Sequence, residues 1–195
     1  MTIRDIELLA PARDLACGLA AVDHGADAVY IGGPGFIARA AAGNSLADIQ
    51  ALVEHAHLFG VRVYVALNTL LRDEELAPAV ALIHQLDEIG VDALIIQDLG
   101  LLECHLPPIP LHASTQLDNR TPDKVRFLEQ VGFTQVVLAR ELSLAQIRDI
   151  RAATTVALEC FVHGALCVSY SGQCFISEVM REAADSLLEV LPAVK

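Results

Sequence analysis

A repeated unit of helix, glycine and strand constrains the fold of this chain more than any other feature of its sequence. The segment Gly25-Ala26-Asp27-Ala28-Val29 is echoed by Gly90-Val91-Asp92-Ala93-Leu94, and each places a helix-ending glycine immediately before an apolar run. Gly60-Val61 and Gly132-Phe133 hold the same place in their units. Strands that alternate with helices in this way predict right-handed crossovers and a parallel sheet.

The repeat predicts about seven strands and several firmly capped helices. The expected strands lie at about 6–11, 27–32, 61–68, 92–97, 110–116, 135–140 and 156–163. Capping signals begin three helices, namely Ser45 with Asp48, Thr121 followed by Pro122, and Ser143 with Gln146. No Gly-x-Gly-x-x-Gly follows a strand, so a dinucleotide-binding sheet has little support.

Polar residues at alternate strand positions favour a barrel over an open sheet, whose strands tend to be apolar on both faces. One face of several expected strands carries Arg62, Tyr64, Asn68, Gln97, His112, Ser114, Gln116, Arg140, Glu159 and His163. The prediction is an α/β fold, a TIM-like (β/α) barrel over residues 1–195, incomplete at about seven parallel strands. Residues 178–190 have the pattern of an amphipathic C-terminal helix and not of an eighth strand.

Composition argues against several classes of function. The formal net charge is −12, so a broad phosphate-binding face is not expected. No apolar run reaches the roughly 18 residues that cross a bilayer, and no signal-peptide layout is present, which predicts a cytoplasmic protein with no membrane partner. In that reducing compartment the five cysteines are expected to be thiols or metal ligands.

Chemical groups converge in the stretch from Glu159 to Ser177. Glu159 and His163 are expected on one face of the last strand, with Arg140 arriving from the preceding strand, so that three polar groups share one cavity. Cys160 alternates with Glu159 and is expected to be a core thiol. Two structural alternatives stay open: Arg140 could be an ion-pair partner of Glu159, and His163 could bond to a backbone carbonyl.

Six segments together resemble one known family. They are L-L-A-P-A (8–12), G-A-D-A-V-Y-I-G-G (25–33), N-T-L (68–70), H-A-S-T-Q (112–116), V-L-A-R-E-L-S (137–143) and E-C-F-V-H-G-A-L-C-V-S-Y-S-G-Q-C (159–174). Their order resembles peptidase family U-32 over about residues 6 to 178, and the last segment is specific to that family. Y-I-G-G-P-G-F and I-P-L-H-A-S-T-Q look most like the branch that makes 5-hydroxycytidine in ribosomal RNA.

The resemblance implies an activity and two ligands. Although the family is named for collagenase-type proteolysis, its members of known role are mostly oxygen-independent hydroxylases of RNA bases or of a quinone precursor. It implies a [4Fe-4S] cluster held by four cysteines and, in the RNA branches, prephenate as the source of oxygen. Cys167 and Cys174 match the first two ligands, but no second pair follows Cys174. We therefore expect the chain alone not to hold a stable cluster.

The predicted site residues fall into three groups. The expected catalytic residues are His163, Glu159, Arg140, Gln116 and His112. The expected substrate-binding residues are Arg39, Tyr64, Asn68 and Ser114, and the expected metal ligands are Cys167 and Cys174. A hydrogen-bonded core layer is the alternative for His112, Ser114 and Gln116, and a solvated loop arginine is the alternative for Arg39.

Three functions stay open at this point. The first is a hydroxylase acting on ribosomal RNA, and the second is a collagenase-like peptidase. The peptidase would need a pair such as Cys167 and His163, because no G-x-S-x-G or H-E-x-x-H occurs. The third is a truncated, inactive scaffold or subunit. In each case we expect the open barrel edge to be covered by helix 178–190, by a second copy or by a partner chain.

Overall fold

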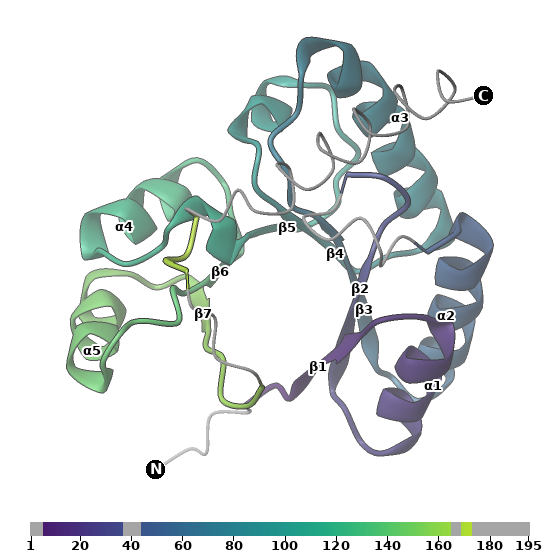
Figure 1. The fold of residues 1–195 in the computed structure, drawn as a ribbon, viewed down its shortest axis with the longest axis horizontal. Helices are drawn as coiled ribbons and strands as arrows, with labels where there is room; N and C mark the ends of the chain where they lie inside the picture. Colours follow the sequence, from purple (N-terminus) through teal and green to yellow (C-terminus); the bar gives the residue numbers. More distant parts are fainter. Residues whose placement is uncertain (1–5, 37–43, 165–168, 173–195) are drawn as a thin grey trace, which may run out of the picture.

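A curved parallel sheet with helices on its outer side forms the body of the protein (Figure 1). The computed structural model describes residues 6–36, 44–164 and 169–172. Within these residues seven strands pair in chain order, each parallel to the next. They are β1 (Leu9–Ala12), β2 (Ala28–Gly32), β3 (Arg62–Leu67), β4 (Ala93–Ile96), β5 (Leu111–Ala113), β6 (Gln135–Val137) and β7 (Ala157–Glu159). The predicted incomplete TIM-like barrel is confirmed.

The helices are α1 (Leu15–Asp23), α2 (Leu46–Leu58), α3 (Asp73–Ile89), α4 (Pro122–Gln130) and α5 (Leu144–Ala153), with the short 3-10 helices η2 (Leu99–Glu103) and η3 (Thr115–Leu117). Three of the helices, α2, α4 and α5, begin where the sequence predicts them. The hydroxyls of Ser45, Thr121 and Ser143 accept the backbone N–H three residues on, which satisfies donors that a helix start leaves unpaired. In this described part, no helix is long and apolar enough to span a bilayer.

Two apolar layers lie on opposite faces of the sheet. Between the sheet and the helices, fully buried side chains from strands and helices interlock, among them Ile31, Val65, Leu94, Leu52 and Leu86. Inside the curve lies a smaller layer of Ala28, Tyr64, Ala66, Ala93, Ile95 and Val137. Burying each large aliphatic side chain stabilises the fold by about 1.5–3 kcal/mol. The outer layer therefore supplies most of the stability, and the inner layer can accommodate polar groups.

Strands β5 to β7 end earlier than the sequence predicts. After Ala113 the chain turns into η3, because Ser114 Oγ accepts the backbone N–H of Gln116 at 3.2 Å. After Val137 the backbone N–H of Ala139 donates to the carbonyl of Asn119 at 3.1 Å and not to a neighbouring strand. The expected strands 110–116, 135–140 and 156–163 were too long at their carboxyl ends. The shortening leaves loops, and not strand, at this end of the sheet.

The outer edges of β1 and β7 have no strand partner among the described residues. Apolar side chains lie beside these edges: Ile6 and Leu8 precede β1 and are 89% and 56% exposed, and Val162 follows β7 and is 88% exposed. Residues 178–190 lie outside the described part of the chain. The expectation that this helix, a second copy or a partner chain covers the gap therefore stays a prediction.

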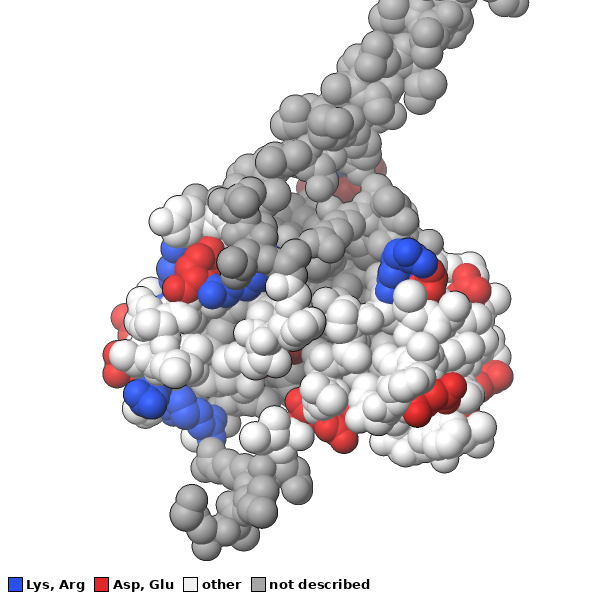
Figure 2. All heavy atoms as spheres, turned by 60° about the horizontal axis from the view of Figure 1, so that its bottom comes forward, with Lys and Arg blue, Asp and Glu red and all other residues white. Residues whose placement is uncertain are grey.

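Basic side chains lie in small separate groups on the face that Figure 2 shows, most of them beside acidic ones. Arg13 pairs with Asp14 at 2.8 Å, and Arg120 pairs with Asp118. The face in Figure 2 therefore shows no continuous basic patch that could bind phosphates.

Candidate functional site

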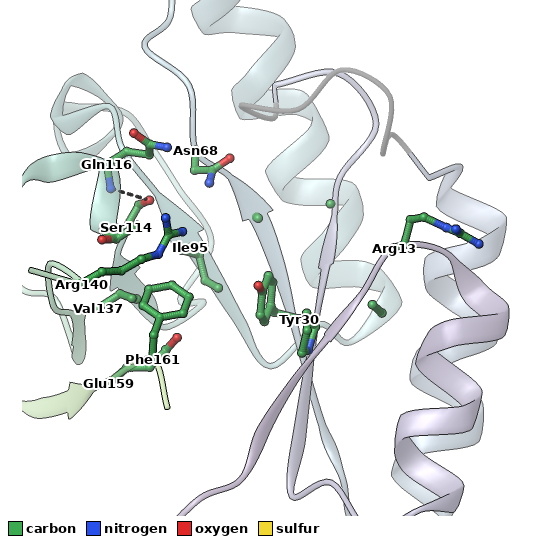
Figure 3. Close-up of a pocket in the computed structure, with 15 residues that line it drawn as sticks. Arg13, Tyr30, Asn68, Ile95, Ser114, Gln116, Val137, Arg140, Glu159 and Phe161 are labelled. Carbon is green, nitrogen blue, oxygen red and sulfur yellow. Dashed lines mark hydrogen bonds between the residues drawn. The ribbon is translucent and has the colours of Figure 1, made fainter. Parts of the chain in front are cut away.

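A cavity of about 300 Å³ opens inside the curved sheet, where the strands end (Figure 3). Each of the seven strands or the loop that follows it contributes to its wall. The lining residues are Pro11, Ala12, Arg13, Tyr30, Gly32, Ala66, Asn68, Ile95, Ser114, Thr115, Gln116, Val137, Arg140, Glu159 and Phe161. In a β/α barrel this end of the strands is where active sites form, because several loops converge there. The cavity is therefore the candidate active site.

Glu159 supplies the one carboxyl group of the cavity wall. It is the last residue of β7, and Gln135 of β6 donates from Nε2 to Glu159 Oε2 at 2.8 Å. Burial raises the pKa of the Glu159 carboxyl above its ordinary value, and the bond from Gln135 opposes the shift. No described lysine or arginine forms an ion pair with Glu159, which is consistent with the raised pKa. The carboxyl therefore holds its proton to a higher pH than an exposed glutamate.

Arg140 lies in the cavity wall, on the loop after β6. The expectation that it belongs to a strand was wrong, because β6 ends at Val137. Its guanidinium carbon lies 4.5 Å from the centre of the Phe161 ring, close enough for a cation–π contact. Figure 3 shows Phe161 between Arg140 and Glu159, which fits the absence of an ion pair between the two charged groups in this part of the structure. The stacked pair forms one rim of the cavity.

The loop after β5 brings a hydroxyl and an amide to the cavity. Ser114 is almost fully buried at 1% exposed, and Gln116 of η3 lines the cavity, as Asn68 does (Figure 3). Asn119 holds this loop against β6, because its side-chain nitrogen donates to the carbonyls of Ser114 and Val137, both at 2.8 Å. Sequence reasoning missed Asn119. The positive φ of 59° at Asp118 marks the turn that aims it inward.

His112 and Tyr64 lie inside the curve of the sheet but do not line the cavity. Their rings meet edge to face with centroids 4.7 Å apart. The Tyr64 hydroxyl lies 3.0 Å from Glu7 Oε2, and the same carboxylate pairs with Arg62. Burial, with a smaller effect of the Arg62 charge, lowers the pKa of His112 to about 4. Both residues are thus placed in a neutral layer beside the cavity.

His163 lies outside the cavity wall. The expectation that it shares a strand face with Glu159 was wrong, because β7 ends at Glu159 and His163 is exposed four residues further on. Cys160 was expected in the core, and it is exposed. Partial burial and the neighbouring Glu159 carboxylate raise the pKa of the Cys160 thiol. The alternation of side chains in the sequence thus continues beyond Glu159, where the strand itself ends.

A short segment after β7 is clasped against η3. Ser171 donates to the Glu141 carboxylate from its backbone N–H at 2.6 Å and from its hydroxyl at 3.0 Å. Burial opposes ionisation, but the hydrogen bonds from Ser171 outweigh it and lower the pKa of Glu141. Gly172 has a φ of 77°, and a Cβ there would lie 2.7 Å from the Gln116 carbonyl oxygen. Sequence reasoning gave Glu141 no role.

Three of the predicted site residues, Arg39, Cys167 and Cys174, lie outside the described residues, so their placement stays a prediction. The described cysteines are Cys17, Cys104 and Cys160. Nowhere in residues 6–36, 44–164 and 169–172 do three or more His, Cys, Asp or Glu side chains group in a way that could hold a metal ion. These residues therefore do not fit a four-thiolate cluster.

Comparison with known proteins gives consistent matches. The family model described as Peptidase family U32 matches residues 13–186. The chain is 62% identical to the 23S rRNA 5-hydroxycytidine C2501 synthase of Escherichia coli K12, over 88% of this chain and 26% of that protein. It is 38% identical to the tRNA hydroxylation protein P of the same organism, over 88% of this chain and 39% of that protein.

A solved structure shares the fold. The structure of the U32 peptidase Mk0906 superposes with a TM-score of 0.64 and 17% sequence identity, over 82% of this chain and 71% of that chain. The chain spans between about a quarter and two fifths of the length of the two E. coli relatives.

Proposed function

The chain belongs to peptidase family U32, and from that membership we propose that it forms the base-binding half-barrel of an enzyme that hydroxylates cytosine in ribosomal RNA. The observation that carries the proposal is the cavity of about 300 Å³ at the carboxyl ends of the strands. The identity of 62% to a ribosomal RNA 5-hydroxycytidine synthase supports cytosine as the base.

The size and lining of the cavity suit one nucleobase. Its volume lies at the low end of small-molecule pockets. Enzymes that modify a base extrude it into such a pocket, stack it on aromatic rings and read its polar edge. Tyr30 and Phe161 supply the rings, while Asn68, Gln116 and Glu159 supply amide and carboxyl groups. The cavity thus offers both kinds of contact that a flipped base requires.

The charge of the chain limits its role in holding the RNA backbone. Non-specific RNA binding relies on clustered lysine and arginine, whereas this chain has a formal charge of −12 and pairs several arginines with acids. The proposal therefore assigns base binding to this chain and most of the phosphate contacts to other parts of the RNA-modifying protein. A ribosomal RNA substrate would place the protein in the cytoplasm.

The family implies an iron–sulfur cluster, and in its RNA branches prephenate as the source of oxygen. The described residues do not fit the cluster, so no step is derived through it. We retain the proposal that the chain alone holds less than one [4Fe-4S] cluster. Anaerobic reconstitution followed by iron and sulfide analysis tests it: close to four irons per chain would contradict it, and about two would indicate a cluster shared between chains.

Peptide hydrolysis is less well supported by the cavity. A cysteine or serine protease needs a nucleophile beside a general base, usually histidine. Among the described residues, no histidine and no cysteine lines the cavity, and Ser114 is 1% exposed. A peptide-release assay with Cys167→Ala and His163→Ala variants as controls tests this second function directly.

Nucleoside mass spectrometry of ribosomal RNA tests the hydroxylase proposal. Cells that lack the gene should lose 5-hydroxycytidine, and the wild-type gene should restore it. Arg140→Ala, which removes the cation stacked on Phe161, should restore about tenfold less, since a stacking or cation–π contact is worth roughly 1–2 kcal/mol. Arg148→Ala, on the exposed side of α5, is the matched control and should restore it fully. Unchanged 5-hydroxycytidine in the deletion strain would reject the proposal.

A further inference from the structure

Among the residues that line the cavity, Glu159 has the one carboxyl group, and this group can bind a ligand. Glu159 is held in place by Gln135, whose amide donates to Oε2 at 2.8 Å. Within residues 6–36, 44–164 and 169–172 this is the only hydrogen bond of its side chain, and Oε1 accepts none. The bond to Oε2 thus orients the Glu159 side chain, and Oε1 remains available to a ligand in the cavity (Figure 3).

We propose that Glu159, in its protonated form, reads the Watson–Crick edge of a cytosine bound in the cavity and selects it against uracil. The inference rests on the proposed function and adds a specificity-determining residue to it. Cytosine presents the N3 acceptor beside the N4–H donor, and a neutral carboxyl presents O–H beside C=O. Two hydrogen bonds can therefore form at once. Uracil in the same position sets its N3–H against the carboxyl O–H and its O4 against the C=O, so both contacts are mismatched. Uracil pairs with the neutral carboxyl only after it shifts by one position along its edge, away from the position that cytosine takes.

The environment of Glu159 favours the neutral carboxyl that this pairing needs. Burial disfavours the ionised form and raises the pKa of Glu159. A cation would reverse the effect, but the arginines that line the cavity are engaged elsewhere: Arg13 pairs with Asp14, and Arg140 stacks on Phe161. Gln135 donates to one oxygen and leaves the second free to carry the proton.

The other titratable groups near Glu159 keep their protonation states around neutral pH. Burial keeps His112 neutral, with a pKa of about 4. Burial also raises the pKa values of Tyr64 and Cys160, and the negative charge of an ionised Glu159 raises both further. Both groups therefore stay protonated. Arg62 and Glu7 form an ion pair with each other, and the Tyr64 hydroxyl bonds to Glu7. Cytosine binding should therefore weaken as the pH rises through the raised pKa of Glu159.

The orientation that Glu159 imposes leaves the reactive carbon accessible. The carbon that becomes hydroxylated in 5-hydroxycytidine is C5, which lies outside the N3–N4 edge. A base paired to Glu159 by that edge directs C5 and C6 to another part of the cavity. Tyr30 and Phe161 line the cavity as rings on which its faces can stack. Recognition and reaction thus use different edges of the same base.

Ligand-observed NMR titration of the full chain with cytidine and with uridine tests the inference. We expect cytidine to bind about tenfold more tightly than uridine at a pH below the raised pKa of Glu159 but above the range in which cytosine N3 takes up a proton, which is the discrimination typical of a bidentate pair. The preference should shrink as the pH rises. Glu159→Ala should lose the preference. Glu159→Gln should restore it without the pH dependence, because a carboxamide presents N–H beside C=O at every pH. Glu54→Gln, an exposed glutamate on α2, is the control and should behave as wild type.

Several outcomes would overturn the inference, and circular dichroism of each variant separates them from misfolding. They are equal binding of the two nucleosides, a preference that survives in folded Glu159→Ala, no binding of either nucleoside, or binding that strengthens at high pH. The last result would assign the ionised carboxylate to an ion pair. The proposed function is tested separately by the deletion strain. If that strain keeps its 5-hydroxycytidine while the chain still prefers cytidine through Glu159, the proposed function fails and the inference about Glu159 stands.

Discussion

The first four strands of the sheet and the last three differ in regularity. Strands β1 to β4 span four to six residues and pack under helices of up to 17 residues, whereas β5 to β7 span three residues each. Among the described residues, Asn44 is the only buried polar residue before β5; the others are His112, Ser114, Thr115, Asn119 and Thr154. The long, apolar first part acts as the scaffold.

This difference shows how one part of the fold provides stability and another part provides the candidate active site. Short strands release the backbone early, so that the chain turns into loops such as the one from Ser114 to Asn119. Each turn needs side-chain hydrogen bonds in place of strand pairing, which accounts for the buried Ser114, Thr115 and Asn119 there. Substitutions in the first part should therefore mainly affect stability, and substitutions in the last part should also affect the cavity.

The largest effect is expected in the scaffold. Leu52 of α2 is fully buried and packs so closely on Gly18 of α1 that a Cβ there would lie 2.8 Å from a Leu52 methyl group. Leu52→Ala should lower the free energy of unfolding by about 2–5 kcal/mol through lost burial and a cavity. Urea denaturation measures the change. Leu58→Ala on the same helix, at an 81% exposed residue, should cost less than about 0.5 kcal/mol. Equal costs would refute the scaffold role.

The next effect concerns pH and the layer beside the cavity. His112 has a folded-state pKa of about 4, below the ordinary value of 6.5. As the pH falls below 6.5, the unfolded chain binds a proton that the folded chain does not, so stability is lost between pH 6.5 and about 4. The loss should reach roughly 3 kcal/mol. His112→Phe keeps a ring against Tyr64 but cannot titrate, so its stability should fall less over this range in pH-dependent urea denaturation. Parallel curves for the two proteins would contradict the assignment.

A smaller effect is expected at the loop that carries Ser114. Asn119→Ala removes the two donations to the carbonyls of Ser114 and Val137 and leaves both without that partner. The free energy of unfolding should fall by about 1–3 kcal/mol. Cytidine binding should weaken as well, because Ser114 lines the cavity. Gln50→Ala removes an exposed amide of α2 and should change neither quantity measurably. A stable Asn119→Ala variant with unchanged binding would separate this loop from the site.

The smallest effect tests the clasp after β7. Gly172→Ala introduces left-handed strain at φ 77° and a contact with the Gln116 carbonyl, at a cost of about 1–2 kcal/mol. Gly25→Ala introduces similar strain at φ 91° with no atom within 4 Å of the new Cβ, so the pair isolates the contact. Hydrogen exchange of the Ser171 amide should accelerate about tenfold in Gly172→Ala only. Acceleration in both variants, or in neither, would show that the contact does not hold the segment.

Local patterns in the sequence determined the framework of the protein. The glycines before the strands, the caps at Ser45, Thr121 and Ser143, and the alternation of polar and apolar residues all act over a few residues. They predicted the seven parallel strands, the incomplete barrel and the inward direction of Tyr64, His112, Ser114 and Glu159. Short-range sterics and hydrogen bonding set these features, so a short stretch of sequence is enough to read them.

The tertiary structure alone decided where the last strands end and which groups meet. Arg140 lies on a loop and His163 lies outside the cavity because β6 and β7 stop before them. The bonds that set the site join residues far apart in the chain: Asn119 to Val137, Gln135 to Glu159 and Glu141 to Ser171, with separations of 18, 24 and 30 residues. Such contacts join residues that only the folded chain brings together, so no local pattern encodes them. The alternating pattern after Glu159 therefore failed to predict the side-chain directions there, because β7 ends at Glu159.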